Sequence, residues 1–233
     1  MSHRIAVLLT SNDESAFAKR FPNDGEKVIT LLRALRPDWS YRVWSVKDGE
    51  FPSSTDADGY IITGSPASVH DPLDWIARLT ALICELHSRR APLVGLCFGH
   101  QAIALALGGR VEKSPGGWRM GIAATHFSKK LPWMAPYHPT LELYASHSEQ
   151  VTQLPATAQR LGGDDFCPIA SFVLDQHIMT TQYHPEFSPT FMSELTDVLV
   201  RKLPAEVIAQ AREELKREAQ GEVFAQWMVK FLE

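Results

Sequence analysis

The sequence is poor in cysteine and has no long apolar run, and both shortages exclude classes of protein. Only Cys84, Cys97 and Cys167 occur among its 233 residues, and no two of them form a CxxC pair. Three widely spaced cysteines build neither a disulfide framework nor a zinc site, so any cysteine that matters acts as a thiol. No apolar segment approaches the roughly 18 residues that a membrane span requires. We therefore expect a cytoplasmic protein that makes no membrane contact.

An excess of positive charge is missing as well. The chain has 27 acidic and 23 basic side chains, a net charge of -4, and no basic tract. Binding to duplex nucleic acid requires clustered Lys and Arg, so no nucleic-acid partner is expected. The composition, 45% hydrophobic and 21% charged, is that of a globular protein, and no repeat or shift in composition marks a boundary. The sequence therefore predicts a single domain over residues 1–233.

Short apolar runs alternate with amphipathic stretches, and this pattern predicts the fold class. Helices are expected at 24–35 and 73–88, and strands between them at 4–9, 41–46, 59–63 and 92–96. After Gly108-Gly109 the expected strands are shorter, at 110–113, 121–125, 141–145, 169–173 and 178–182. We predict an α/β fold with a mostly parallel central sheet flanked by helices, to which the later strands add mixed or antiparallel pairs.

The carboxyl-terminal part of the chain predicts helices. Ser188-Pro189 has the pattern of an N-cap followed by proline at the first helical position, and Pro204 opens a helical extension over 204–233. Apolar residues near the end recur at helical spacing, at Phe224, Trp227, Met228, Phe231 and Leu232. We expect this face to dock on the core, and the alternative is a contact in a homodimer.

The segment from Pro92 to Gln101 is the most informative in the chain. A buried strand meets a helix there, with Cys97 at the junction and Gly95 and Gly99 two residues away on either side. A strained strand-to-helix turn needs glycine at such places, because a Cβ would strike the crossing backbone. The turn places the sulfur at a helix amino terminus, where unpaired N–H groups favour a thiolate. Cys97 is therefore the candidate nucleophile.

A cysteine nucleophile needs a base and a group that orients the base. The segment from Gln182 to Glu186 follows an apolar strand and offers both in one turn. Pro185 biases His184 toward an extended conformation, so that the imidazole can point away from the strand end. Glu186 can then accept the second ring N–H. His184 is the predicted base and Glu186 the residue that orients it.

Two motifs together resemble the signature of class I glutamine amidotransferases. They are Gly95-Leu96-Cys97-Phe98-Gly99-His100-Gln101 and Tyr183-His184-Pro185-Glu186. Thr63-Gly64-Ser65-Pro66 stands where that family has its oxyanion loop, and residues 146–151 are similar to its Ser-His-x-Asp-x-Val segment. The resemblance implies a flavodoxin-like α/β domain in which a Cys-His-Glu triad attacks the side-chain amide of glutamine and forms a γ-glutamyl thioester.

The resemblance assigns each role to a particular residue. It implies a triad of Cys97, His184 and Glu186, with oxyanion donors from the N–H of Phe98 and from the Gly64-Ser65 turn. A small γ-glutamyl substrate is expected to contact Gln101, Ser146, His147 and Ser148. No cofactor is expected, and no metal either, because no cysteine or carboxylate cluster has ligand spacing with His147 or His184.

Two departures from the family pattern bear on function. The family often has Gly-Gly-Pro where this chain has Gly64-Ser65-Pro66, so the oxyanion loop must accommodate a Cβ. Many relatives are fused or bound to a synthase that consumes the ammonia, whereas only about 30 residues follow the amidotransferase-like region here. The overall pattern, with Gly116-Gly117-Trp118 after the elbow helix, is most similar to free-standing GMP-synthase-like amidotransferases, whose relatives include γ-glutamyl peptidases.

Three functions are therefore open. The leading one is hydrolysis of a γ-glutamyl amide bond by the chain itself. The second is a glutaminase subunit that supplies ammonia to a separate synthase partner, and the third is a non-catalytic, amidotransferase-like scaffold. The presence of all three triad residues argues against the scaffold. An intracellular protease of the related kind usually has histidine directly after the cysteine, where this chain has Phe98.

A few conspicuous residues fall outside these roles. His100 is expected to make structural hydrogen bonds, and Cys84 and Cys167 to be inert because no glycine elbow surrounds them. Trp118 is expected either to cover the pocket or to fill the core. Residues 11–23 follow the first strand and so lie over the edge of the sheet where the elbow sits, as a solvated loop or as a segment that selects the substrate.

Overall fold

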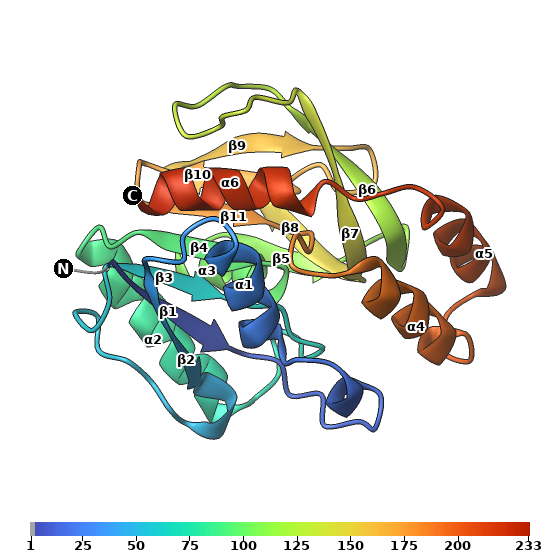
Figure 1. The fold of residues 1–233 in the computed structure, drawn as a ribbon, viewed down its shortest axis with the longest axis horizontal. Coiled ribbons are helices and arrows are strands. Elements are labelled where there is room, and N and C mark those ends of the chain that lie inside the picture. The colour runs from blue at the N-terminus through green and yellow to red at the C-terminus, as the bar shows by residue number, and fades with distance from the viewer. Residues whose placement is uncertain (1–2) are drawn as a thin grey trace.

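A nine-stranded sheet forms the centre of the computed structural model, which describes residues 3–233 (Figure 1). In sheet order its strands are β2 (Ser40–Ser45), β1 (Arg4–Leu9), β3 (Gly59–Ile62), β4 (Leu93–Leu96), β11 (Ile178–Thr181), β10 (Ser171–Leu174), β9 (Ala158–Gly163), β6 (Arg119–Phe127) and β7 (Thr140–His147). The first five run parallel to one another, and the other four join by antiparallel pairing. The predicted α/β fold is confirmed.

Helices cover both faces of the parallel strands. Helices α1 (Asp24–Arg33) and α6 (Gly221–Leu232) pack on one face, and α2 (Asp74–Ser88) and α3 (Phe98–Ala106) on the other. Successive residues of a strand point to opposite faces, so Ile5 and Val7 belong to the core under α1 and α6, whereas Ala6 and Leu8 belong to the core under α2 and α3. Strands covered on both faces are apolar throughout, which explains the continuous hydrophobic runs.

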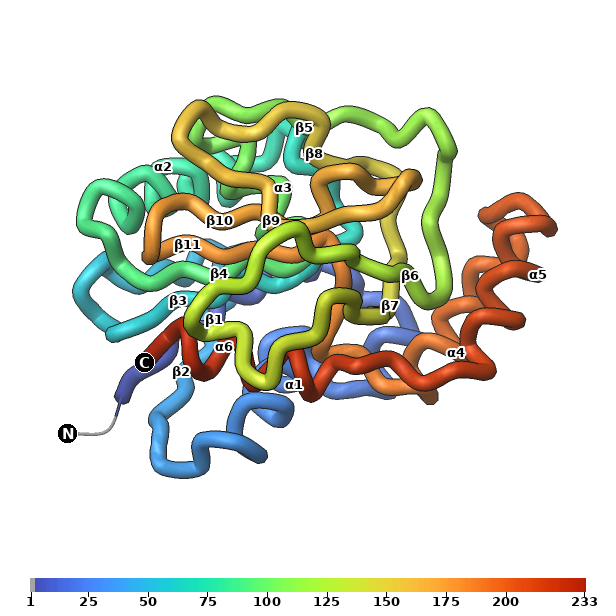
Figure 2. The backbone as a smooth tube through the Cα atoms, turned by 90° about the horizontal axis from the view of Figure 1, so that it is seen from above, coloured from blue at the N-terminus to red at the C-terminus, as the bar shows by residue number. Residues whose placement is uncertain are grey.

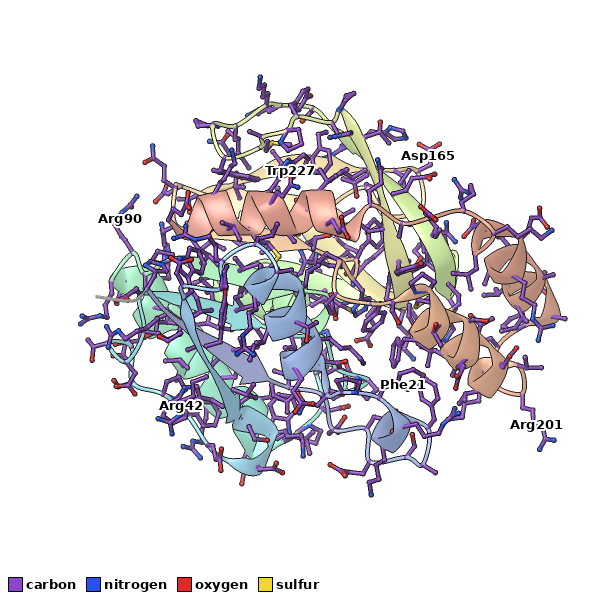
Figure 3. The ribbon with its side chains drawn as sticks, in the orientation of Figure 1. Phe21, Arg42, Arg90, Asp165, Arg201 and Trp227 are labelled. Atoms are coloured by element: carbon purple, nitrogen blue, oxygen red, sulfur yellow. The ribbon has the colours of Figure 1, made fainter. Side chains whose placement is uncertain are left out.

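The carboxyl-terminal helices divide into a projecting pair and a core helix. Ser188 caps α4 (Pro189–Leu199) by accepting the N–H of Phe191, as predicted, and α5 (Ala205–Glu214) follows. These two helices project beyond the sheet in both views (Figures 1 and 2). The apolar face of α6, which carries Trp227 (Figure 3), is buried, and the indole N–H of Trp227 donates a hydrogen bond to the carbonyl of Pro136. The expected docking of the terminal helix is confirmed.

One prediction about the later strands is wrong. Strand β5 (Arg110–Lys113) does not join the central sheet but pairs with β8 (Glu149–Gln153) in a separate two-stranded sheet. Neither β8 nor β9 was predicted, because each exposes several of its side chains and shows only a weak apolar pattern. The β5–β8 pairing joins residues about 40 positions apart, which no local pattern can reveal. Among residues 3–233, no helix is long and apolar enough to cross a membrane.

Candidate active site

The candidate residues meet at one edge of the sheet because three neighbouring parallel strands end there. Gly64 follows β3, Cys97 follows β4 and His184 follows β11, and β4 pairs with both β3 and β11. Open α/β sheets bind their ligands at the carboxyl ends of parallel strands. A Cβ built on Gly64 would lie 2.8 Å from Cε1 of His184 and 3.6 Å from Cβ of Cys97. The three motifs, which are spread over about 120 residues of the sequence, therefore lie next to one another.

The β4–α3 junction is the strained elbow that the sequence predicts. Cys97 has φ 48° and ψ -100°, a conformation that side chains other than glycine rarely adopt, and it caps α3. A Cβ on Gly95 would lie 2.8 Å from the carbonyl oxygen of Gly99, and a Cβ on Gly99 would lie 2.5 Å from that of Ile62. Both glycines are thus required for the backbone to cross here. The sulfur sits at the amino end of α3, only 6% of the residue being exposed.

His184 is held between the sulfur and a carboxylate. Its Nδ1 lies 2.8 Å from Oε1 of Glu186, and both side chains are buried. Burial by itself lowers the pKa of His184, but the neighbouring side chains of Cys97 and Glu186 outweigh burial and raise that pKa to about 10. The imidazole is therefore a cation at neutral pH, and its Nδ1–H donates to Glu186. The protonated ring of His184 thus lies near Cys97, where it can later give up a proton.

An aromatic ring supports this imidazolium. Phe187, directly after Glu186, stacks on His184 with ring centroids 3.9 Å apart and planes 7° from parallel. Phe187 packs in turn against Phe191 of α4. The face of an aromatic ring attracts a cation, so Phe187 both fixes the plane of the imidazole and favours its charged form. Sequence reasoning missed this residue, although its position next to the motif was a signal.

A chain of two amides reaches the sulfur from the other side. Nε2 of Gln182 lies 3.5 Å from Sγ of Cys97, and Oε1 of Gln182 accepts a hydrogen bond of 3.1 Å from Nε2 of Gln101. The same Nε2 of Gln101 donates to the carbonyl of Glu149 at 2.6 Å. Gln182 is fully buried and was not assigned a role from the sequence, although it stands two residues before His184. Oε1 of Gln101 accepts no hydrogen bond from any described residue.

Residues 146–148 form the end of β7 and the residue that joins it to β8. The carbonyl of Ser148 accepts the N–H of Ser114, and Ser146 and Ser148 are partly exposed. His147 is buried, and burial, followed by the positive charge of His184, lowers its pKa to about 3. It is therefore neutral, and neither ring nitrogen has a partner among the described residues. His147 lies close to the candidate triad, with its ring centroid 5.8 Å from that of Tyr183, the neighbour of His184. Ser146 and Ser148 make no side-chain hydrogen bond to a triad residue in the part of the chain that the structure describes.

Phe98 and Ser65 offer the two backbone N–H groups expected to hold an oxyanion. Phe98 is the first residue of α3, where an N–H has no partner within the helix. Ser65 belongs to neither a helix nor a strand, and no described residue accepts its N–H. The Cβ of Ser65 is accommodated because its Oγ turns to the carbonyl of Thr10 at 2.8 Å. The loop thus tolerates serine where relatives often have glycine.

The remaining conspicuous residues take structural positions. Nδ1 of the buried His100 lies 2.8 Å from Oγ1 of Thr180, and burial lowers the pKa of His100 to about 3, which agrees with a structural role. Cys84 is exposed on α2, and burial raises the pKa of Cys167. Trp118 is 37% exposed and lines a cavity of about 620 Å³ with Phe166 and residues of α5, so it is not core filling.

Residues 11–23 form more than a solvated loop. Their short helix η1 (Ala18–Arg20) is flanked by Phe17 and Phe21, whose rings pack against Phe191 of α4. Figure 3 shows Phe21 beside α4. Because Phe191 also touches Phe187, an aromatic row connects this segment to the ring that supports His184. Within residues 3–233, no three His, Cys, Asp or Glu side chains form a cluster able to hold a metal ion.

Comparison with known proteins identifies the family. The model of the glutamine amidotransferase class-I family matches residues 30–199. The chain therefore belongs to the class I glutamine amidotransferases. It is 27% identical to gamma-glutamyl peptidase 3 of Arabidopsis thaliana, over 93% of this chain and 90% of that protein.

Two further matches show how the likeness is distributed. The chain is 33% identical to the glutamine-hydrolysing GMP synthase of an Azoarcus strain, over 57% of this chain but only 26% of that protein. Among solved structures, a glutamine amidotransferase from Thermotoga maritima superimposes with a TM-score of 0.74 at 16% identity and covers 100% of this chain and 96% of that one. The fold is thus that of the family, and relatives of this chain include enzymes named for γ-glutamyl bonds.

Proposed function

We propose that the chain hydrolyses a γ-glutamyl amide or peptide bond, with Cys97 as nucleophile, His184 as general acid and base, and Glu186 as the residue that orients His184. The observation that carries this proposal is the geometry at the strained elbow: Nδ1 of the buried His184 lies 2.8 Å from Oε1 of Glu186, and a Cβ on Gly64 would contact both His184 and Cys97. Membership of the amidotransferase family and the peptidase relatives support the γ-glutamyl group as the substrate.

The first half of the reaction forms a thioester. The thiolate of Cys97 attacks the γ-carbonyl carbon, and the N–H groups of Phe98 and Ser65 hold the resulting oxyanion. The tetrahedral intermediate collapses, its C–N bond breaks, and the departing nitrogen takes the proton of His184 as it leaves as an amine or ammonia. The γ-glutamyl group is then bound to sulfur, and His184 is neutral.

The second half releases glutamate. Neutral His184 takes a proton from water as the water oxygen attacks the thioester carbonyl. The C–S bond breaks, glutamate departs, and the thiolate and imidazolium of the starting state are restored. Glu186 keeps Nδ1 protonated throughout, so that the other ring nitrogen exchanges the proton. Oε1 of Gln101 and the segment 146–148 are proposed to hold the α-amino and α-carboxylate groups. No step requires a metal or a cofactor.

The glutaminase subunit is the second candidate, and one observation favours it. The similarity to GMP synthase reaches 33% identity, although it covers only 26% of that protein. The likeness to gamma-glutamyl peptidase 3 spans 90% of that protein, so the hydrolase remains the first choice. A single domain over residues 1–233, a cytoplasmic location, and a homodimer or a synthase partner all remain proposals. The non-catalytic scaffold is disfavoured because all three residues of the candidate triad are present and His184 contacts Glu186.

Purified protein assayed with glutamine, glutathione and γ-glutamyl dipeptides tests the proposal. We expect turnover without ATP or a partner, unchanged by EDTA. Iodoacetamide should inactivate the enzyme in proportion to alkylation at Cys97, mapped by mass spectrometry, and Cys97→Ser should be inactive. The matched control Cys84→Ser should keep full activity, because that residue is exposed and its thiol contacts the carbonyl of Ala106 and no residue of the candidate triad.

The outcomes separate the three functions. Labelling of Cys97 by a chloroketone glutamine analogue without any turnover would favour the glutaminase subunit. Folded protein that neither turns over nor is labelled would favour the scaffold. Full activity in Cys97→Ser would contradict the proposed mechanism outright.

A further inference from the structure

A buried threonine at the end of β1 holds the oxyanion loop from behind. Oγ1 of Thr10 lies 2.8 Å from the carbonyl oxygen of Gly64 and 3.0 Å from that of Thr63. Oγ1 of Thr63 accepts the backbone N–H of Thr10 at 3.1 Å and donates to the same carbonyl of Gly64 at 3.1 Å. Thr10 and Thr63 are both fully buried. Two hydroxyl groups therefore reach one carbonyl oxygen, that of Gly64.

This contact fixes the direction of the next N–H group. In a trans peptide the C=O and the following N–H point in opposite directions, and the peptide between Gly64 and Ser65 is trans. With its carbonyl tied to Thr10, the N–H of Ser65 must point away from Thr10. Gly64 touches Cys97 and His184. Rotation of this peptide would take the donor away from its position and break both hydroxyl contacts.

The side chain of Ser65 adds a second link between the loop and Thr10. Its Oγ donates to the carbonyl of Thr10 at 2.8 Å and accepts the N–H of Ala67 at 3.2 Å. The hydroxyl of Thr10 thus binds the carbonyl of Gly64, and the hydroxyl of Ser65 binds the carbonyl of Thr10. Further along the loop, Oγ of Ser68 donates to Glu149 at 2.8 Å. A glycine at position 65 would lack both bonds of the Ser65 hydroxyl, the one to Thr10 and the one from Ala67.

We infer that Thr10 and Ser65 are positioning residues that lock the oxyanion loop in its donating orientation within the free chain. The inference rests on the proposed hydrolase function and adds to it a regulatory property, since a loop locked by the chain itself needs no partner to order it. The fold supplies the lock from β1, an element that carries none of the catalytic motifs. Neither residue touches the reacting atoms through its side chain.

Thr10→Val tests the lock because it removes the hydroxyl and keeps the shape. We expect kcat for glutathione or glutamine to fall about 100-fold, the loss of one oxyanion donor, with KM changed less than about threefold. Thr10→Ser retains a hydroxyl and should recover most of kcat. Ser65→Ala, at a partly exposed position, should lower kcat about tenfold. Thr196→Val is the matched control, because Thr196 is equally buried but bonds within α4.

A second readout does not depend on turnover. A chloroketone glutamine analogue places an oxyanion in the hole, whereas iodoacetamide alkylates the sulfur without one. In Thr10→Val the rate of labelling at Cys97 should fall for the chloroketone and stay within about twofold for iodoacetamide. If wild-type protein turns over and folded Thr10→Val and Ser65→Ala keep full kcat, the lock is refuted while the hydrolase stands. If the wild type has no turnover, the proposed function fails, and an unchanged ratio of labelling rates would refute the lock as well.

Discussion

At the scale of single residues, His184 is surrounded by groups that keep its ring fixed and charged. Glu186 binds Nδ1, Cys97 raises the pKa of the ring, and Phe187 covers one face of the ring. An isolated charge buried in a protein costs several kcal/mol, so the pairing is required for the imidazolium to exist there. The candidate site therefore acts as a unit, because the loss of one member leaves a buried group of another without its partner.

Removing the members of this unit one by one should rank them. His184→Ala should lower kcat as far as Cys97→Ser does, by about 10⁴-fold or more, because the thiolate and the departing amine both lose their proton partner. Glu186→Gln keeps a side chain of the same size that still touches Nδ1, so the loss should be at least about tenfold smaller. Steady-state kinetics on folded variants measures the order. A greater loss in Glu186→Gln than in His184→Ala would mean that the base is wrongly assigned.

Phe187→Leu isolates the contribution of the stacked ring. Replacing the aromatic face with an aliphatic one should lower kcat about tenfold and shift the alkaline limb of the pH profile downward by up to about one pH unit. Phe187→Tyr keeps the face and should behave like the wild type. Phe191→Leu changes a ring that touches Phe187 but not His184, so its pH profile should not move. Equal shifts in Phe187→Leu and Phe191→Leu would reduce Phe187 to a packing residue.

At the scale of elements, the β4–α3 elbow depends on two backbone crossings. Gly95 lies against Gly99, and Gly99 lies against the end of β3, which carries the oxyanion loop. Strand, elbow helix and oxyanion loop are therefore held at distances that no side chain can occupy. The same close approach brings Gly64 next to Cys97, since a Cβ on Gly64 would lie 3.6 Å from that of Cys97.

Gly99→Ala should disrupt this element. Its Cβ would meet the carbonyl oxygen of Ile62 at 2.5 Å, and backbone cannot move aside without shifting β3. We expect a loss of roughly 2–5 kcal/mol in the free energy of unfolding, measured with denaturant. Gly25→Ala in α1 is the control, since its Cβ would meet only side-chain atoms, at 3.0 Å or more. If the two variants were equally stable, the elbow would be less tightly packed than the structure indicates.

At the scale of the whole molecule, the parallel and antiparallel halves of the sheet contribute differently to the candidate site. Its parallel half, covered by helices on both faces, holds the elbow, while the antiparallel half returns the chain so that Tyr144 of β7 forms a bridge with His184. The histidine is thus fixed by both halves. The row of rings from Phe187 to Phe21 adds a third connection, to the segment between β1 and α1.

The raised pKa of His184 connects the site to global stability. Because this pKa is about 10 in the folded chain and 6.5 in the unfolded one, the stabilisation by the imidazolium is fully present below pH 6.5 and is lost as pH rises through about 10. The difference in unfolding free energy between wild type and His184→Ala should therefore shrink between pH 7 and 10. Turnover should fall above about pH 10, where the proton for the leaving amine is absent. A difference that is constant over this range would contradict the assignment of a charged His184.

The sequence by itself determined the fold class, the elbow and the residues of the candidate triad. These features are local: Gly95 and Gly99 allow the close crossing of the backbone on either side of Cys97, and Pro185 biases His184 toward an extended conformation. The same is true of the Ser188 cap of α4 and of the apolar face of α6, which lies on the core as expected. The predicted strands at 4–9 and 110–113 match the structure, and the boundaries of the others differ by one or two residues, because strand ends depend on pairing partners.

Only the tertiary structure decided which distant groups support the site. Three such residues carry no motif of their own and are identified by their contacts. Thr10 contacts Gly64, Phe187 stacks on His184, and Gln182 reaches Cys97. The β5–β8 pair and the bridge from Tyr144 to His184 likewise join segments about 40 residues apart. Hydrogen bonds and ring contacts across such separations depend on how the chain packs, which no pattern of neighbouring residues contains.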